Sequence, residues 1–595
     1  MVSPTGPSPD RTSALRRRGT IGCLVAVALA GLVYVNALHN PFIYDDFRLV
    51  VENRAITDIR EVRAIVAHDA TRPLVALSYA LDRKIWGPEP FGFHLTNVLL
   101  HMINVGLFAW LVWSGCEDRR RHPGSSGQLR AARAAPIAAL LFAIHPLLTE
   151  AVGYISGRSE LLCGAFFLLA LHSGRAALLS RRTSWLFVTL GCWVLALASK
   201  ETALLFPVVL FLYDRWVIGA TAQSATPGLP TIARSATVGL YLTLGSVAAI
   251  LATARLAVFL WIEHSKVSIQ GSLIWVELDA VRQYVTMLIL PFGQSIFHEV
   301  SAAGPASPGV LVALVGIIAC TAAAWRWRRG HGLASLGVFW FLLLLAPSSL
   351  LVLFDRGEPI AEHRVYVASM GAFLIAGLAV DRLVGWLAAR GATSTLVLTS
   401  VTLAIVVAFG GRTYLRNEIW SDPLVVWLDA AERAPASWFP ALMLGEELHR
   451  RGQHDQAIGA FRRAIQARPS EPSPHGKLGL CLAELGDLDG AAAEFSRQHE
   501  LDPAAADATN GLATVALLRG DLKTARLRYL DTLAIDDINI SARRGLAAIE
   551  EAPGGNPSEA LRWCEDIRRL APETPGNDDC IRRNQDRIAG RTSGS

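Results

Sequence analysis

The chain has 595 residues, of which 52% are hydrophobic and 18% charged, and its mean hydropathy is +0.35. This is too apolar for a soluble protein of such length and too mixed for a membrane domain throughout, so two regions of different character are expected. The formal net charge is only +5, and the arginines stand in small groups between apolar runs. Nucleic acid is therefore excluded as an expected partner.

The first apolar run covers residues 19–38 and follows three arginines at 16–18. About 20 apolar residues cross a bilayer, and a basic flank stays in the cytoplasm. Small residues at 35–37 give the alternative of a cleaved signal peptide, but the many apolar runs that follow favour an uncleaved anchor. Residues 1–18 are then a cytoplasmic N-terminus.

Two adjacent carboxylates, Asp45 and Asp46, follow this run and would emerge on the outer side. An ionisable pair at a membrane surface, ahead of many more crossings, indicates chemistry on a lipid-linked substrate. The alternative is a loop acid pair that caps a short helix, because Asp is common at helix caps. The residues leave open which aspartate reacts and whether a divalent metal binds there.

A second apolar run, 92–114, carries four polar side chains on one helical face, at spacings of three, four and three residues. These are His94, Asn97, His101 and Asn104. Such a stripe must face protein or water, and it either joins helices or orients a substrate. The loop before it contains Arg72 and an apolar patch, 75–81, that could lie flat on the bilayer.

Nine further runs are suited to crossing the membrane. They are 135–152, 160–179, 185–198, 202–218, 236–261, 309–324, 333–353, 366–380 and 394–410. With the first two they make about eleven crossings. Segment 275–291 is taken as interfacial or re-entrant, because a crossing there would export the arginines of 326–329. An odd number of crossings places the C-terminus outside and keeps the arginine groups 119–121, 181–182 and 326–329 in the cytoplasm.

Charged side chains at the ends of these runs gather on the outer side. They are His145, Glu150, Arg158, Glu160, Lys200, Glu201, Glu362, His363 and Arg364. Arg158, Lys200 and Arg364 could hold a phosphate, the arginines through a planar fork of donors and the lysine as a point charge. The alternative, that each group only reaches toward the interface, does not explain why acids and bases alternate on one side.

Beyond residue 420 the sequence becomes charged and rich in Ala and Leu, with a period of 34 residues. The glycines that repeat are Gly445, Gly479, Gly452, Gly486 and Gly520, and the aromatic residues are Phe461, Phe495 and Tyr529. This pattern is typical of about four tetratricopeptide repeats over 438–576, after a linker at 412–437 and before a flexible tail at 577–595. Such a stack forms a groove that binds an extended peptide or a protein.

The eight cysteines include no pair with the spacing of a zinc site. Four of them, Cys23, Cys163, Cys192 and Cys320, lie in apolar runs and are expected to be buried thiols. Cys564 and Cys580 lie near the C-terminus. They could form a disulfide if that end is outside the cytoplasm, or remain two free thiols.

A series of short motifs, in order along the chain, carries a resemblance to a known family. They are Tyr44-Asp45-Asp46, Arg72-Pro73, Phe93-His94, Asn97, His101, His145-Pro146, Thr149-Glu150, Gly157-Arg158, Ser199-Lys200-Glu201 and Glu362-His363-Arg364-Val365-Tyr366. Together with the repeats, they resemble the transmembrane and tetratricopeptide repeat-containing O-mannosyltransferases and their bacterial relatives over nearly the whole chain. Glu160 departs from the family, in which Asp is expected after the Gly-Arg-Ser run.

The resemblance implies an all-α C-type glycosyltransferase bundle over 19–411, followed by the repeat solenoid, in a bacterial inner membrane with the repeats outside. It implies transfer, with inversion, of mannose or another hexose from a polyprenyl-phosphate carrier. The acceptor would be a protein hydroxyl presented by the repeat groove, with membrane lipids around the bundle.

The resemblance also implies the roles of individual residues. Asp45 or Asp46 would be the base, and Arg158, Lys200 and Arg364 would bind the donor phosphate. Substrate-orienting residues would be Arg72, His94, His101, His145, Glu150, Glu160, Glu201, Glu362, His363 and Tyr366. Two other classes of function stay open: a non-catalytic membrane scaffold whose repeats recruit partners, and a transporter of lipid or polysaccharide.

Overall fold

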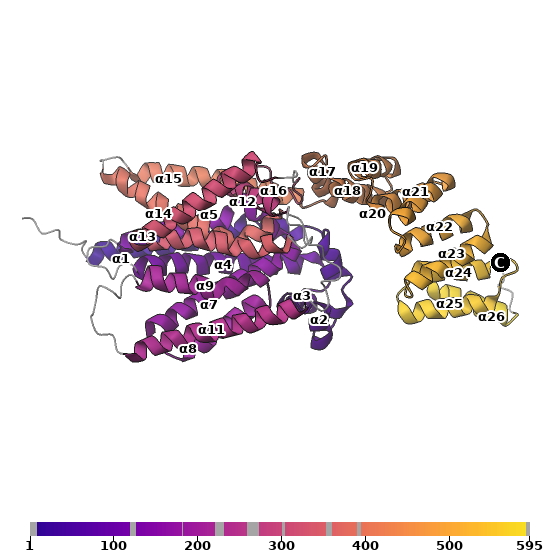
Figure 1. The fold of residues 1–595 in the computed structure, drawn as a ribbon, viewed down its shortest axis with the longest axis horizontal. Coiled ribbons are helices and arrows are strands. Elements are labelled where there is room, and N and C mark those ends of the chain that lie inside the picture. Colours follow the sequence, from indigo (N-terminus) through magenta and orange to yellow (C-terminus); the bar gives the residue numbers. More distant parts are fainter. Residues whose placement is uncertain are drawn as a thin grey trace, which may run out of the picture. The chain divides into compact units, whose positions relative to one another are not determined.

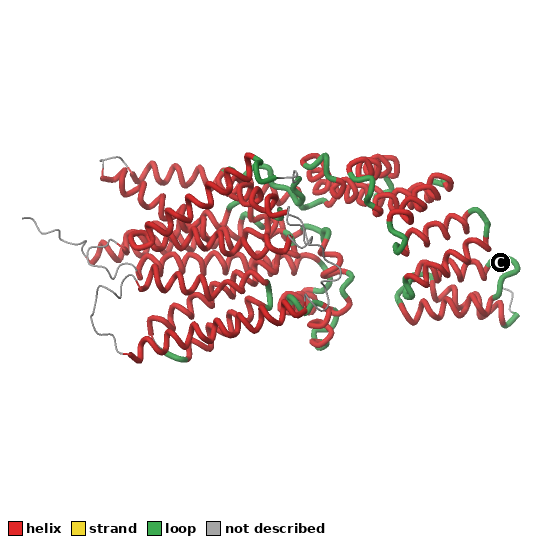
Figure 2. The backbone as a smooth tube through the Cα atoms, viewed as in Figure 1, coloured by secondary structure: helices red, strands yellow, loops and turns green. Residues whose placement is uncertain are grey.

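The computed structural model describes residues 9–118, 127–180, 182–219, 231–258, 273–299, 304–352, 360–389 and 394–590. Every regular element in these ranges is a helix, as Figures 1 and 2 show. The all-α prediction is confirmed. The chain divides into two compact units, Met1–Val426 and Trp427–Ser595.

The first unit contains five described helices that are long and apolar enough to cross a membrane. They overlap α1 (Pro9–Leu32), α4 (Pro90–Asp118), α7 (Arg158–Ser180), α13 (Pro308–Val352) and α14 (Tyr366–Ala389). A sixth span results if α5 (Gly127–Ile144) and α6 (Thr149–Gly153), which are bent by 54°, are counted as one. The unit is a membrane-spanning bundle, and the count of eleven crossings stays a prediction.

The long helix α13 corresponds to two of the predicted crossings. A straight helix of its 45 residues would be roughly 68 Å long, about twice the hydrocarbon thickness of a bilayer. His331 interrupts it with φ −134° and ψ 41°. The halves on either side of His331 match the expected runs 309–324 and 333–353. The arginine group 119–121 and Arg181 lie outside the described residues.

Other predicted crossings fall on helices that are not among these five candidate spans. These are α8 (Ser184–Leu197), α9 (Phe206–Tyr213), α11 (Thr231–Val258) and α15 (Ser394–Ile405). Single turns flank or precede the longer helices: η1 (Val35–His39), η2 (Phe47–Val51), η3 (Arg54–Ile56), η5 (Pro146–Leu148), η6 (Ile155–Gly157), η7 (Glu201–Leu205), η8 (Asp214–Ile218), η11 (Glu362–Val365) and η12 (Val406–Gly410). The expected interfacial segment forms α12 (Leu273–Ile289), which is not among the candidate spans of the described chain.

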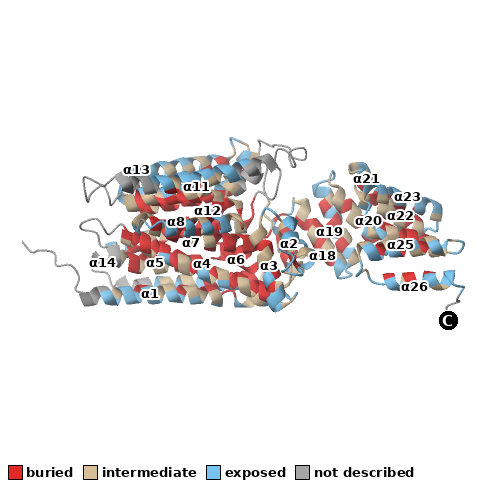
Figure 3. Cartoon of the chain, turned by 90° about the horizontal axis from the view of Figure 1, so that it is seen from below, coloured by how far each residue is buried: buried red, intermediate tan, exposed pale blue. Residues whose placement is uncertain are grey.

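The outer helices of the bundle present apolar faces. Figure 3 shows α5, α6 and α7 buried inside it, whereas α1 and α13 present exposed faces. On α13, the side chains of Val312, Val315 and Ile318 are each more than 60% exposed. Apolar faces of this kind suit contact with lipid.

Two short helices, α2 (Val62–His68) and α3 (Pro73–Trp86), lie at one end of the bundle (Figures 1 and 3). The patch 75–81, expected on the bilayer surface, lies in α3 and packs on protein instead. Its buried residues belong to a small core with Phe93, Ile155 and Leu162. The patch packs on protein rather than lying on the bilayer because α4 and the start of α7 present an apolar surface to α3.

The expected linker, 412–437, is mostly helical, with α16 (Gly411–Ile419) and α17 (Pro423–Arg433). Helix α16 is tied into the first unit. The Thr413 hydroxyl donates to the Ile144 carbonyl at 2.7 Å, and the Asn417 amide donates to the Val33 carbonyl at 3.1 Å.

The second unit is a series of helix pairs. Its helices are α18 (Trp438–Arg450), α19 (His454–Ala467), α20 (Pro472–Glu484), α21 (Leu488–Leu501), α22 (Ala506–Leu518), α23 (Leu522–Ile535), α24 (Ile540–Glu551), α25 (Pro557–Leu570) and α26 (Asn577–Ile588). Residues 577–588 form α26 rather than a flexible tail, because Ile581 and Asn584 are buried. A disulfide joins Cys564 and Cys580.

Glycines space the repeat helices. Gly452, Gly486, Gly520 and Gly554, at the turns between paired helices, have φ between 72° and 86°, a region that strains other residues. Inside the helices, a Cβ at Gly445 would lie 2.5 Å from the ring of Phe461. Small residues therefore allow the aromatic side chains to fill the space between helices.

Replacing Gly545 with Ala should destabilise the repeats, because the new Cβ would lie 2.2 Å from the ring of Tyr529. Overpacking of this kind costs about 1–3 kcal/mol. Gly459→Ala is the matched control, since nothing lies within 4 Å of its added Cβ. Thermal unfolding and limited proteolysis of the purified chain measure both. Equal unfolding temperatures for the two variants would contradict the packing described.

Candidate active site

A bent passage of short helical turns separates α5 from α7. Between Ile144 and Arg158 the chain forms η5, the short helix α6 and η6. Backbone groups freed by such a break cost several kcal/mol each in a membrane unless other groups bind them. Here side chains bind them: Asn97 donates to the Tyr154 carbonyl at 3.0 Å, and the Tyr79 hydroxyl donates to the Ile155 carbonyl at 3.1 Å.

The polar stripe of α4 faces this passage and its neighbours. The His101 ring lies 3.2 Å from the Ala143 carbonyl, and the Asn104 amide donates to the Leu161 carbonyl at 2.9 Å. The His94 ring lies 3.1 Å from the Asn40 carbonyl. All four stripe residues are buried. They join helices and loops to one another, which is one of the two roles that the spacing allowed.

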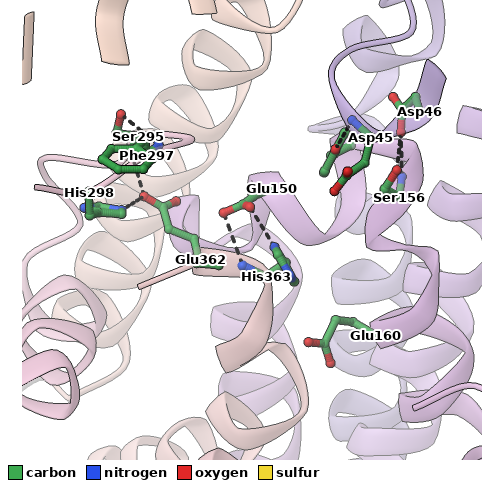
Figure 4. Close-up of polar contacts among 12 residues, drawn as sticks. Asp45, Asp46, Glu150, Ser156, Glu160, Ser295, Phe297, His298, Glu362 and His363 are labelled. Atoms are coloured by element: carbon green, nitrogen blue, oxygen red, sulfur yellow. Dashed lines mark hydrogen bonds and ion pairs between the residues drawn. The ribbon is translucent and has the colours of Figure 1, made fainter. Parts of the chain in front are cut away.

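The acid pair divides into a buried and an open carboxylate. Asp46 is 1% exposed and accepts three hydrogen bonds: from the Ile43 N–H at 3.1 Å, the Ser156 N–H at 2.9 Å and the Ser156 hydroxyl at 2.5 Å (Figure 4). The Asp45 side chain is 41% exposed, and its backbone N–H donates to the Tyr154 hydroxyl at 2.9 Å.

Tyr44, just before the pair, has φ +51°, the only positive value at a non-glycine residue in the described chain. A left-handed conformation costs about 1–3 kcal/mol and persists where the surroundings fix it. The hydrogen bonds of Asp45 and Asp46 to the passage between α5 and α7 fix it here. Burial raises the pKa of Asp46 to about 7, although the hydrogen bonds from Ser156 and Ile43 act in the opposite direction.

Asp45 lines a cavity of about 370 Å³ at this end of the bundle. Its polar lining consists of Asp45, Arg48, Asn53, His68, Asp69, Thr71, Arg72, Tyr79, Tyr154, Ser156, Ser159 and His363. These residues come from the loop after α1, from α2, α3 and the turn between them, from the passage between α5 and α7, from the start of α7, and from η11. Two aspartates and two arginines balance one another, so the empty lining carries no net formal charge when its histidines are neutral.

Arg72 is the partly buried cation of this cavity. Its guanidinium donates to Glu201 at 3.4 Å, and both side chains remain more than one third exposed. Burial lowers the pKa of Arg72, but Glu201, Glu160 and Asp69 outweigh it and the pKa is raised. For Glu201, burial raises the pKa, but Arg72 and Lys200 outweigh it and the pKa is lowered. Both members of the pair are therefore charged.

His363 reaches the cavity from η11 and is held by Glu150, whose carboxylate lies 2.7 Å from the His363 ring (Figure 4). A second pair lies beside it, in which Glu362 accepts from the Ser295 N–H at 2.7 Å and lies 2.9 Å from the His298 ring. The consecutive η11 residues Glu362 and His363 therefore belong to two separate glutamate–histidine pairs.

A family model for the tetratricopeptide repeat matches residues 442–500. Among curated proteins, Protein O-mannosyl-transferase TMTC1 of Homo sapiens is 25% identical over 80% of this chain and 59% of its own length. Protein O-mannosyl-transferase Tmtc1 of Drosophila melanogaster is 32% identical over 34% of this chain and 24% of its own length. Protein O-mannosyl-transferase TMTC2 of Mus musculus is 30% identical over 37% and 27%.

This chain is similar to the transmembrane and tetratricopeptide repeat-containing O-mannosyltransferases. The aligned parts span between one quarter and three fifths of the lengths of these three relatives. Among solved structures, MamA is 18% identical, covering 25% of this chain and 88% of its own, with a TM-score of 0.23. The tetratricopeptide protein YrrB is 14% identical, covering 28% and 85%, with a TM-score of 0.23.

Two of the three cations that the family resemblance assigned to phosphate lie in the cavity wall, not on its surface. Arg158 is fully buried, forms an ion pair with Asp82, and donates to Asn97 at 2.8 Å and to the Phe93 carbonyl at 2.6 Å. Lys200 is 3% exposed and forms an ion pair with Glu160.

The remaining site candidates are placed as follows. Arg364 is partly buried and follows His363, which lines the cavity. His145 is 1% exposed, and its ring lies 3.1 Å from the Leu288 carbonyl. The Tyr366 hydroxyl lies 2.9 Å from the His101 ring. Of the residues assigned to substrate orientation, the cavity lining includes Arg72 and His363.

Four residues that hold the site together are not among those predicted from the sequence. Ser156 and Tyr154 bind the acid pair, His298 binds Glu362, and Asp82 neutralises Arg158. Of the four, only Asp82 could have been suspected from the sequence, because it follows directly after the apolar patch 75–81 and lies at a position that α3 buries. The others depend on contacts between residues more than 60 positions apart.

Replacing Asp82 with Asn should destabilise the bundle by about 3–5 kcal/mol, because it leaves the Arg158 charge buried without a counter-ion. Glu117→Gln is the matched control in the same unit. It removes a partner of Arg16 in a pair whose side chains are 53% and 31% exposed, and should cost about 0–1 kcal/mol. Thermal unfolding in detergent compares the two. A loss for Asp82→Asn no larger than that of the control would contradict the burial of this pair.

The raised pKa of Asp46 predicts a pH-dependent stability. The folded chain holds the Asp46 proton up to a pH of about 7, whereas an unfolded aspartate releases it at about 3.9. The unfolding temperature of the wild type, relative to Asp46→Asn, should therefore fall as pH rises from about 4 to about 7 and level off above. A difference that does not change with pH would show that Asp46 titrates normally.

Proposed function

We propose that this protein is a membrane glycosyltransferase that moves a hexose from a polyprenyl-phosphate carrier to a hydroxyl outside the cytoplasm. The observation that carries the proposal is the open carboxylate of Asp45, which lines the same cavity as Arg72 and His363. The names of the relatives, protein O-mannosyl-transferases, support mannose as the sugar and protein as the acceptor.

In the proposed reaction the acceptor oxygen displaces phosphate at the anomeric carbon, with inversion. Asp45 takes the acceptor proton as the bond between carbon and phosphate oxygen breaks, which requires a carboxylate open to the substrate. Asp46 is unsuited to this step because its oxygens already accept three hydrogen bonds and it is buried. We assign Asp46 to positioning the loop that carries Asp45.

The leaving phosphate needs cations rather than an acid. Arg72 lines the cavity and presents a planar fork of donors, which suits binding to phosphate oxygens. Arg364, next to His363, is our second candidate. Arg158 and Lys200 would act indirectly. Their ion pairs with Asp82 and Glu160 hold α3, α7 and η7 at fixed positions around the cavity.

The repeats would present the acceptor on the outer side of the membrane, which is the orientation expected from eleven crossings and the arginine groups. A non-catalytic scaffold is the second candidate function, and the repeats alone favour it, since tetratricopeptide stacks commonly bind peptides.

Asp45→Asn should reduce sugar transfer by at least about 100-fold, the usual contribution of a general base. Asp46→Asn should reduce it less, through the position of the loop. Asp58→Asn is the matched control, because Asp58 is an exposed aspartate of the same loop and does not line the cavity. The measurement is release of polyprenyl phosphate from a labelled polyprenyl-phosphate hexose by the purified chain with a protein acceptor.

Each alternative gives a different result in this assay. A scaffold forms no glycosidic bond with any variant and keeps its partners in Asp45→Asn. A transporter moves labelled carrier lipid across proteoliposomes without a new glycosidic bond. A greater loss for Asp46→Asn than for Asp45→Asn would reverse the assignment of the base.

A further inference from the structure

A cluster of metal-binding side chains lies in the second unit, far along the chain from the proposed sugar site. His449 is in the last turn of α18, His454 is the first residue of α19, and Glu484 is the last residue of α20. One ligand atom from each lies within 4.8 Å of the other two. In the described part of the chain, this is the only such group of three or more.

Cys481 lies beside the cluster, next to His454, and could supply a fourth ligand. It lies one turn before Glu484, is fully buried and is a free thiol. Its sulfur is 3.7 Å from His454 Nδ1 and 3.8 Å from the His454 carbonyl. Donor atoms of a tetrahedral zinc site are separated by about 3.3–3.7 Å, given the bond lengths of about 2.0–2.3 Å. The sulfur and the ring nitrogen thus stand close to the separation that zinc needs.

The other two side chains lie next to each other and would have to move slightly apart to bind a metal. His449 Nε2 lies 2.7 Å from Glu484 Oε2, and the two histidine rings have centroids 5.4 Å apart, tilted by 56°. The Glu484 side chain is 46% exposed, so it can turn inward at little cost. In the absence of a metal the same atoms form an ordinary imidazole–carboxylate contact.

We propose that His449, His454, Cys481 and Glu484 bind a zinc ion. Two imidazoles, one thiolate and one carboxylate are ligand types that zinc prefers. On binding, the Cys481 thiol loses its proton to solvent, and one thiolate plus one carboxylate then neutralise the two charges of the ion. A neutral complex suits a site in which the sulfur is fully buried.

The spacing supports this set. The histidines form H-x4-H and the other two ligands form C-x2-E. Each spacing occurs between ligands of zinc sites, the second one with Cys where this chain has Glu. A search for cysteine pairs alone could not find it.

The repeats themselves show that the cluster is not part of the common repeat pattern. Thirty-four residues farther along, the four equivalent positions hold Ala483, Leu488, Val515 and Leu518. These residues cannot bind a metal. The ligands therefore belong to one boundary between repeats, where the ion would connect the turn after α18 with the end of α20.

The test uses the purified full chain without a polyhistidine tag. We expect one equivalent of zinc after dialysis, and with Co²⁺ the visible bands of a tetrahedral site together with a thiolate-to-cobalt band in the near ultraviolet. Cys481→Ser should abolish the thiolate band. His454→Gln should lower the affinity for the metal at least about tenfold, because removing a residue that only hydrogen-bonds to a ligand already lowers it that much. His499→Gln, on α21 and outside the cluster, should change neither.

Zinc should also raise the unfolding temperature of the wild type relative to chelator, and leave that of His454→Gln unchanged. Circular dichroism in chelator verifies that the variants are folded. Stoichiometric binding that depends on these residues supports the site. Absence of stoichiometric metal, or binding unaffected by Cys481→Ser and His454→Gln, would overturn it without bearing on sugar transfer.

Discussion

The rest of the membrane unit depends on the break between α5 and α7, where side chains bind the backbone carbonyls that the break frees. A membrane bundle tolerates non-helical backbone only where protein groups bind the freed carbonyls. Asn97 and Tyr79 do so here, and Asn97 also receives the guanidinium of Arg158. Because the break is held in this way, Ser156 lies where it can bind Asp46 and so fix the loop that carries Asp45 and Asp46.

Charge at this end of the bundle follows a simple division. Fully buried groups, such as Arg158 and Lys200, each have an acidic partner, because an unpaired charge there would be costly. Groups at the cavity surface keep part of their charge open to a ligand, as Asp45 and Arg72 do. Buried ion pairs are weak sources of stability, and here they fix the positions of the helices around the cavity. A fixed geometry is what the proposed transfer reaction would require.

The repeat unit uses different means. Its helices pack through glycines against Phe461, Phe495 and Tyr529, contacts that recur at each repeat. Against that regular background, a departure from the pattern is informative. Polar metal-binding residues at one repeat boundary, in positions that are apolar at the next, indicate a local function rather than a requirement of the fold.

The sequence by itself determined the all-helical class, the membrane and repeat regions, and the acid pair after the first apolar run, because hydropathy and period are local properties of the chain. It also placed Arg72 and His363 among the candidate site residues. Only the tertiary structure decided that Asp46 is buried and Asp45 open, and that Arg158 forms an ion pair with Asp82. These outcomes depend on partners that are distant in sequence, such as Ser156 for Asp46.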